Sequence, residues 1–324
     1  MTNPVAAMTP SRRWIHRTPE SDLIIAGIAL LALFIALNVR YGNPSSLSQV
    51  LIGAAFVGVI TLGQAWLLAT GEFDLSVGGV AALSAVSGAL VMQASGSVVI
   101  GVAVCVGVGL VFGALNAFCV LLLGLPSFIA TIGTGLIAVG LAVFVTKGDP
   151  VYPLPTELTD IGFASPLGLS WGLFVFLALG LLLNYLSRNT RLGRESIAVG
   201  GDAHTALIAG IRVTHRKAIA FLMCSGLASI AGLMQIASQG TAVPTLGTGV
   251  ELASVAAAVV GGVSVFGGSG TITGAMLGVV FLNVLTSGLA ASGVSPNWQT
   301  FAIGFILILA IALDVARRRR KGLT

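Results

Sequence analysis

The chain has 324 residues, of which 56% are hydrophobic and only 8% are charged, and its mean hydropathy is +1.02. A typical soluble domain is about a quarter charged, so this composition excludes an ordinary soluble protein. Charged residues are absent from residues 75–146 and again from residues 252–313. Because an apolar helix needs about 20 residues to cross the hydrocarbon layer, each stretch holds about three crossings.

The sequence therefore predicts an all-α polytopic membrane protein with about ten transmembrane helices. Turns rich in glycine, proline and serine separate the apolar runs. In chain order the expected spans are Leu23–Val39, Leu47–Thr70, Leu75–Met92, Val98–Leu123, Ser127–Thr146, Leu169–Ser187, Ala218–Ser238, Glu251–Phe266, Thr271–Ser292 and Trp298–Asp314. The first run could instead be a cleaved signal sequence, although no clean small-x-small cleavage site ends it.

Basic residues indicate which side of the membrane each loop occupies, because lysine and arginine resist translocation. With ten spans, one side receives only Arg40 and Lys147, and the other receives Arg12, Arg13, Arg17, Arg188, Arg191, Arg194, Arg212, Arg216, Lys217 and the five basic residues of 317–321. We therefore expect both termini to be cytoplasmic.

The same topology divides the chain into a cytoplasmic tail (1–21), a transmembrane domain (22–316) with a cytoplasmic loop over 188–217, and a basic cytoplasmic tail (317–324). The net charge of +5 needs no nucleic acid partner, since the basic residues anchor the topology and suit anionic lipid head groups.

Catalytic chemistry is not expected on this chain. His16, His204 and His215 all fall in cytoplasmic segments, so a metal site within the membrane is not predicted. A phosphate-loop Gly-Lys-Ser/Thr motif is absent from the sequence. We therefore expect no enzyme activity and no metal or cofactor bound by this chain. If ATP and magnesium drive its function, a partner chain must bind them.

Ionisable residues are scarce within the predicted spans, and in a membrane such residues usually mark function. Asp74 and Glu251 lie near span ends, and Asp314 lies beside the basic tail. This scarcity disfavours a proton- or sodium-coupled carrier. It favours a pathway whose energy arrives mechanically from elsewhere.

Three segments carry most of the functional signal. In residues 71–79, Asp74 directly precedes an apolar run and is predicted to cap the next helix. In the loop 188–217, Asp202 can cap a short helix over Ala203–Ala209, which Gly210 can close in the left-handed conformation. The glycine-rich run 261–270 lacks the lysine of a phosphate loop and predicts a tight re-entrant turn between packed helices.

Weak internal symmetry suggests an inverted repeat of five plus five spans. Asp74-Leu75 corresponds to Glu251-Leu252, five spans later, and Asn116 corresponds to Asn283. If the two halves are related in this way, the solute site is expected between them, near the middle of the bilayer.

Several runs of sequence are familiar in order and spacing. They are Gly-Glu-Phe-Asp-Leu-Ser-Val-Gly at 71–78, then 124–134, 193–202 with Ala206, Gly210 and Ile211, 244–252, 261–270, 293–295 and Trp298-Gln299. They resemble the ribose-type permeases of bacterial ABC importers, in the branched-chain amino acid/ribose transport permease superfamily. The first run is similar to the Gly-Gly-Ile-Asp-Leu-Ser-Val-Gly signature, but Glu72 replaces its second glycine and Phe73 replaces a smaller apolar residue.

The resemblance implies a multi-pass subunit of the bacterial inner membrane that works with a cytoplasmic ABC ATPase, an extracytoplasmic solute-binding protein and a second permease chain, identical or related. It implies that the helix Ala203–Ala209 couples the chain to the ATPase. The residues it assigns to coupling are Arg194, Gly200, Gly201, Asp202, Ala206, Gly210 and Ile211.

The sequence thus predicts the permease of an ABC importer for a monosaccharide or a similar small polar solute. Sugar hydroxyls need hydrogen-bonding groups and an aromatic face, and the candidates along the pathway are Asp74, Asn116, Phe128, Thr131 and Asn283. Each of these five residues could equally serve structure. Two alternatives remain at this point: a stand-alone carrier or channel, and a membrane-embedded enzyme or scaffold.

Overall fold

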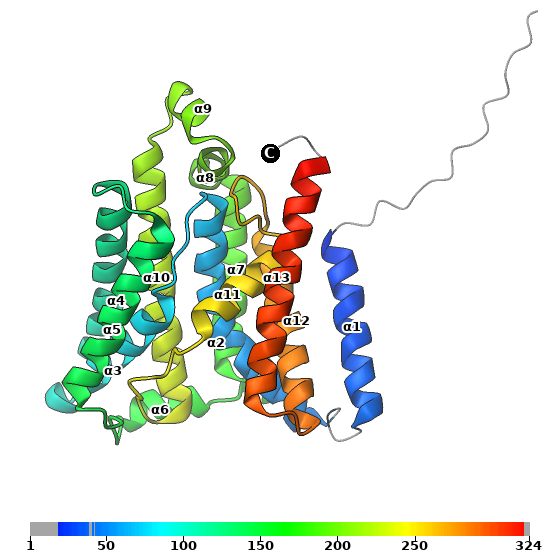
Figure 1. Ribbon diagram of the computed structural model, residues 1–324. Helices are drawn as coiled ribbons and strands as arrows, with labels where there is room; N and C mark the ends of the chain where they lie inside the picture. Colours follow the sequence, from blue (N-terminus) through cyan, green and yellow to red (C-terminus); the bar gives the residue numbers. More distant parts are fainter. Residues whose placement is uncertain (1–18, 39–40, 42, 321–324) are drawn as a thin grey trace, which may run out of the picture.

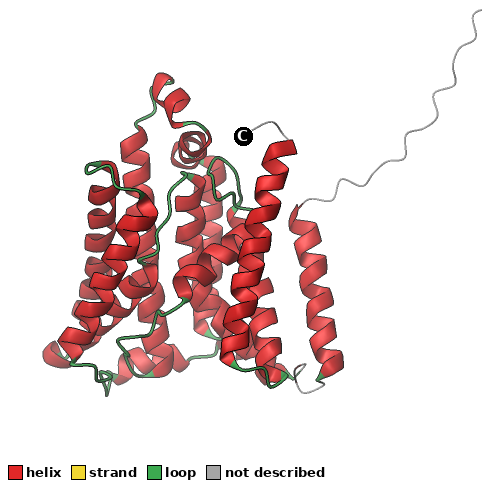
Figure 2. Ribbon diagram, in the orientation of Figure 1, coloured by secondary structure: helices red, strands yellow, loops and turns green. Residues whose placement is uncertain are grey.

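The computed structural model describes residues 19–38, 41 and 43–320, and within them the chain is built from helices and loops (Figures 1 and 2). One isolated bridge pairs Val151 with Ala242. The helices are α1 (Pro19–Leu37), α2 (Pro44–Ala69), α3 (Val77–Ser95), α4 (Val98–Leu121), α5 (Ser127–Thr146), α6 (Thr156–Phe163), the 3-10 turn η2 (Pro166–Gly168), α7 (Trp171–Asn189), α8 (Arg191–Gly201), α9 (Ala203–Ile208), α10 (Val213–Gln239), α11 (Val250–Val260), α12 (Ile272–Ala291) and α13 (Pro296–Arg320).

Ten apolar helices correspond to the ten expected spans. Among the described residues, eight helices are long and apolar enough to cross a membrane: α2, α3, α4, α5, α7, α10, α12 and α13. The apolar parts of α1 and α11 are shorter. The predicted fold class, an all-α polytopic membrane protein, is confirmed, while the inverted repeat stays a prediction.

The expected span Glu251–Phe266 is wrong in extent. Its helix, α11, ends at Val260 after 11 residues, which is about 16 Å of helix and too short to cross the hydrocarbon layer alone. At this end of the helix Gly261 packs against α12, where a Cβ on Gly261 would collide with the backbone of Gly274. Gly262 then takes a φ of +87°, which a helix cannot continue through.

The cytoplasmic loop predicted over 188–217 is also more ordered than expected. It contains α8 (Arg191–Gly201), which the sequence analysis missed, and α10 begins inside it at Val213. The hydroxyl of Thr190 caps α8 by accepting a hydrogen bond from the backbone N–H of Gly193 at 3.4 Å. A helix also forms at Thr156–Phe163 (α6), in a segment for which none was predicted.

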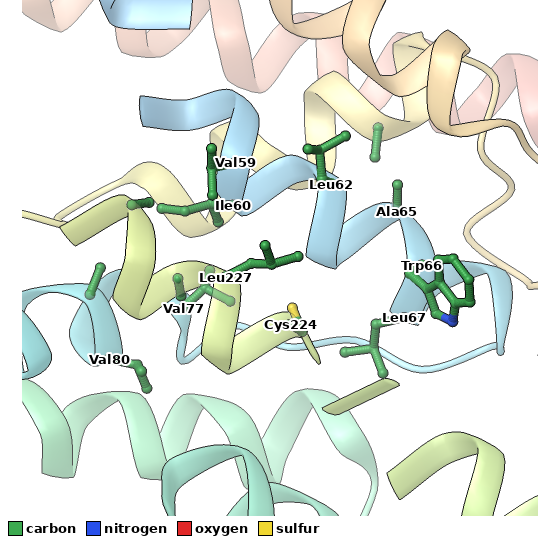
Figure 3. Close-up of a cluster of buried hydrophobic side chains, with 14 of the residues drawn as sticks. Val59, Ile60, Leu62, Ala65, Trp66, Leu67, Val77, Val80, Cys224 and Leu227 are labelled. Atoms are coloured by element: carbon green, nitrogen blue, oxygen red, sulfur yellow. The ribbon is translucent and has the colours of Figure 1, made fainter. Parts of the chain in front are cut away.

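The core of the fold lies where α2, α3 and α10 pack together (Figure 3). Leu62 and Leu67 on α2, Val80 on α3 and Cys224 on α10 are all fully buried there. By contrast, none of the apolar window of α13 is buried. Because lipid solvates apolar side chains, an exposed apolar face of this kind suits a membrane protein.

The start of α1, the end of α13, α8 and α9 all lie toward one face of the helix layer, and α6 lies toward the opposite face (Figure 1). Arg12, Arg13, Arg17, Arg40 and Lys321, which entered the orientation prediction, lie outside the described residues. The described ends are therefore on one side, as an even number of crossings requires.

Candidate functional site

The segment between α2 and α3 is extended rather than helical, and it runs from the α8 face toward the middle of the helix layer before α3 begins (Figure 1). Asp74 was expected to cap α3, but the N-cap is Ser76. The Asp74 carboxylate instead accepts hydrogen bonds from the backbone N–H of Ser76 at 2.8 Å and from its hydroxyl at 2.5 Å. The Asp74 carboxylate thus holds Ser76, the residue directly before α3, and stabilises the turn that leads into the helix.

A fully buried polar cluster surrounds this carboxylate. The amide of Asn116 on α4 donates to both Asp74 oxygens, at 3.4 and 3.3 Å, and to the Ser76 hydroxyl oxygen at 2.8 Å. Ser225 on α10 donates to Asp74 at 3.1 Å, and Thr134 on α5 donates to the Asn116 carbonyl oxygen at 2.6 Å. Asp74, Asn116 and Ser225 have no exposed surface. Since a buried charge or polar group is costly without such partners, the cluster fixes the extended segment among three helices.

Thr131 supports the same segment from α5. Its hydroxyl oxygen accepts a hydrogen bond from the backbone N–H of Leu75 at 3.0 Å and donates to the carbonyl oxygen of Ser127 at 2.7 Å. The structure therefore brings Asp74, Asn116 and Thr131 together. Each binds the protein's own groups.

The other two pathway candidates lie elsewhere. The Phe128 side chain is 52% exposed on the outside of α5. Asn283 donates to the carbonyl oxygen of Val279 in its own helix at 3.2 Å. It packs against α2, where a Cβ on Gly53 would come within 2.8 Å of its oxygen. The five candidates therefore do not line one common pathway in this conformation.

A cavity of about 410 Å³ lies between α3, α5, α11 and the loop before α11. Its wall includes Leu75, Gly79, Thr245, Thr248 and Glu251. Of the five candidates from sequence, none lines this cavity, and Glu251 is the one charged residue that does. Sequence reasoning placed Glu251 near a span end but left it out of the site. Its position opening an apolar run, as Asp74 opens another, was the available signal.

Glycines let the backbones around the cavity approach closely. A Cβ on Gly78 would collide with the carbonyl oxygen of Gly247, and it would lie 2.5 Å from Oε2 of Glu251. A Cβ on Gly79 would lie 2.5 Å from the carbonyl oxygen of Gly135 on α5. Small residues commonly allow such contacts between helices in lipid. The glycines of the 71–79 motif therefore shape the cavity wall.

The predicted cap of the short loop helix is confirmed. Asp202 accepts hydrogen bonds from the backbone N–H groups of His204 and Thr205 at 2.9 and 3.1 Å, and from the Thr205 hydroxyl at 2.5 Å. The hydroxyl bond above all lowers the pKa of Asp202, so the cap is ionised at neutral pH. The helix α9 ends at Ile208, and Gly210 follows with a φ of +81°.

The remaining coupling candidates divide into exposed and packed residues. Ala206 is buried, and its carbonyl oxygen accepts from the backbone N–H of Ile211 at 3.0 Å. Arg194 is exposed on α8. Leu207 and Ile208 are 61% and 75% exposed at the tip of the projection. A short helix with two exposed aliphatic side chains is suited to enter a groove on a partner.

The end of α8 packs directly on two other functional segments. A Cβ on Gly200 would collide with the carbonyl oxygen of Ala69, at the end of α2, and would lie 2.7 Å from the nitrogen of Gly268. That nitrogen donates to the same Ala69 oxygen at 3.1 Å. A Cβ on Gly267 would lie 2.6 Å from the oxygen of Gly200 and 2.9 Å from Cα of Gly71. The loop 188–217, the 71–79 segment and the glycine-rich turn 261–270 therefore meet at one junction.

The family described as "Branched-chain amino acid transport system / permease component" matches residues 22–311. The chain belongs to this permease family. It is a multi-pass protein of the inner membrane, in agreement with its eight candidate spans among the described residues. The match covers the extended segment, the cavity and the loop with α8 and α9, so all three are parts of the family domain.

The ribose import permease protein RbsC of Escherichia coli (strain K12) is 31% identical to this permease over 299 residues, covering 91% of this chain and 93% of that protein. The L-arabinose ABC transporter permease protein AraH of Azospirillum brasilense is 30% identical over 323 residues, covering 98% and 95%. The autoinducer 2 import system permease protein LsrC of Salmonella typhi is 29% identical over 302 residues, covering 93% and 87%. A solved structure with a significant match was not found.

The polar cluster predicts unequal roles for two asparagines. Asn116→Leu removes a buried donor from Asp74 and should cost about 2 kcal/mol or more of stability. Asn283→Leu removes a hydrogen bond within one helix and should cost less than 1 kcal/mol. Thermal unfolding in detergent compares the two variants. Equal shifts in melting temperature would contradict a special role for the Asp74 cluster.

The junction at the end of α8 predicts a contrast between adjacent glycines. Gly200→Ala forces apart backbone segments that cannot yield, and overpacking of this kind costs about 1–3 kcal/mol. Gly201→Ala places its methyl group 3.8 Å from Cα of Gly268, an ordinary contact, and should be tolerated. The yield of monodisperse protein and its melting temperature report both. A Gly200→Ala variant as stable as Gly201→Ala would show that the packing is looser than described.

Proposed function

We propose that this permease is the membrane subunit of an ATP-binding cassette importer that carries a monosaccharide or a similar small polar solute into the cell. The observation that carries this proposal is the match along 91–98% of the chain to permeases whose names specify ribose, L-arabinose or autoinducer 2 import. A match of this extent includes both the cavity and the loop helix. A stand-alone carrier would need neither an exposed coupling helix nor the family's partners.

In this proposal the partner chains supply what this chain lacks. The α8–α9 face is cytoplasmic, because the arginines and lysines of residues 188–217 lie on it and resist translocation. A cytoplasmic ATPase binds ATP and magnesium and receives α9 in a surface groove. A solute-binding protein delivers the solute on the opposite face. Among the described residues, no group of three or more histidine, cysteine or acidic side chains could hold a metal ion.

The cavity beside α3 and α5 is the proposed solute path, and a second permease chain covers its open side. Thr245, Thr248 and Glu251 are the groups that can bond solute hydroxyls, while the rest of the wall is largely apolar. Few polar contacts mean weak binding, which suits a pathway because the solute must leave as readily as it enters. In this arrangement the Asp74 cluster holds the wall and does not touch the solute.

The function is tested by purifying the permease with its partner ATPase in nanodiscs and measuring ATP hydrolysis. The solute-binding protein is added empty or loaded with ribose, arabinose, galactose or xylose. We expect hydrolysis to rise several-fold with one loaded form, and liposomes containing the complex to take up that sugar only with ATP. Uptake by the permease alone, without an ATPase, would instead make it a stand-alone carrier or channel.

The proposed path predicts that Glu251→Gln lowers solute uptake about tenfold, because a hydrogen bond to a charged group contributes about 1.5–3 kcal/mol. Glu157→Gln is the matched control, since Glu157 is exposed on α6 and does not line the cavity. Uptake into liposomes measures both variants, and binding of the ATPase should not change in either. Normal uptake by Glu251→Gln would place the path elsewhere.

A further inference from the structure

One ion pair joins the loop region of the cytoplasmic face to the extended segment. Nζ of Lys217 lies 2.6 Å from Oε1 of Glu72, and the two side chains are only 17% and 13% exposed. Lys217 lies near the start of α10, which follows α9 after four residues. Glu72 lies in the extended segment, two residues before Asp74. The pair therefore joins α10, which follows the proposed coupling helix α9, to the extended segment beside the cavity.

The segment that holds Glu72 leads directly to the cavity. Its backbone N–H groups at Phe73 and Leu75 donate to Ser127 and Thr131 of α5, at 3.3 and 3.0 Å. Leu75 itself, and Gly78 soon after it, line the cavity. Without helical hydrogen bonds of its own, the segment moves only as its side-chain and backbone partners allow. Glu72 is thus only three residues before the first residue of the cavity wall.

The strength of this connection follows from its burial. Exposed ion pairs are screened by water and salt, and most contribute little. A largely buried pair is screened much less, and losing one partner leaves a charge that cannot be solvated fully. Lys217 cannot move away from the segment without that cost. The pair therefore adds a charged link between α10 and the segment to the backbone packing of Gly200 and Gly267 near Gly71.

We propose that the Glu72–Lys217 ion pair is the link that transmits movement of the coupling loop to the wall of the solute cavity. Glu72 and Lys217 act as positioning residues, and neither contacts the solute. This proposal rests on the function proposed above. It also gives a role to Glu72, which stands where similar permeases carry the second glycine of their signature.

The test uses a reporter in the cavity wall and needs no identified solute. Leu75→Cys is introduced into the complex of permease and ATPase, and the rate of its labelling by a small maleimide is measured with ADP and with ATP plus vanadate. The unmodified complex, which retains Cys105, Cys119 and Cys224, gives the background labelling. We expect the two nucleotide states to differ at least threefold in labelling rate.

The ion pair is then changed in ways that separate linkage from stability. The double variant Glu72→Gln/Lys217→Met removes both charges, so no unpaired charge is left buried. It should abolish the nucleotide-dependent difference in labelling rate. The exchange Glu72→Lys/Lys217→Glu should restore the difference. The control is Glu195→Gln/Arg216→Met, which removes a 2.6 Å ion pair between α8 and α10 that does not include the extended segment. That control should retain the difference.

The outcomes distinguish the inference from the function on which it rests. A difference that persists after both Glu72 and Lys217 are neutralised would overturn the link and leave the importer function intact. Loss of the labelling difference in the Glu195→Gln/Arg216→Met control would also overturn the proposed link. Removing an ion pair outside the extended segment would then have the same effect as removing the Glu72–Lys217 pair. A complex in which nucleotide never changes labelling of Leu75→Cys would also overturn the link, while ATP-dependent uptake of sugar by the same complex tests the proposed function separately.

Discussion

The arrangement of the central helices depends on a buried carboxylate that has no basic partner among the residues the structure describes. Asp74 has no exposed surface, and its four donor groups come from the start of α3, from α4 and from α10. A group of this kind is stable in a low-dielectric interior only when hydrogen bonds replace its hydration. The requirement fixes where the extended segment lies and how three helices approach it. The cavity wall, which begins at Leu75, is set by the same contacts.

Close contact between backbones at glycines is the second constraint on the packing of the helices, and it acts at contacts outside the Asp74 cluster. In lipid, apolar burial between helices gives little driving force, so packing at short range has to supply it. Gly78 meets Gly247 at the cavity, and Gly200 meets Ala69 and Gly268 at the face with α8. The glycine-rich turn 261–270, the extended segment and the loop 188–217 are far apart in sequence. Their small residues allow them to share one junction.

These two constraints give the chain a mechanical layout suited to an importer subunit. The loop helix α9 projects from one face with exposed Leu207 and Ile208, and the cavity lies within the helix layer. The segment 71–78 connects the two, and it is extended for part of its length. In the proposed importer the energy source lies on another chain, so this layout needs a way to receive movement and pass it on.

The sequence alone determined the class of the protein, the approximate places of its ten apolar helices and the cap of α9 by Asp202. Those features follow from local rules: about 20 apolar residues for a crossing, and an acidic side chain before free N–H groups. It misplaced the end of α11 and missed α8, because glycines lie inside α8 as well as at the end of α11, and only the φ of +87° that Gly262 takes in the folded chain ends the latter helix. Only the tertiary structure decided that Asp74 and Asn116 face the protein's own groups, that Glu251 faces the cavity and that Glu72 meets Lys217. Each of these is a contact between segments distant in sequence, and which side chains share a buried space depends on packing that no local pattern encodes.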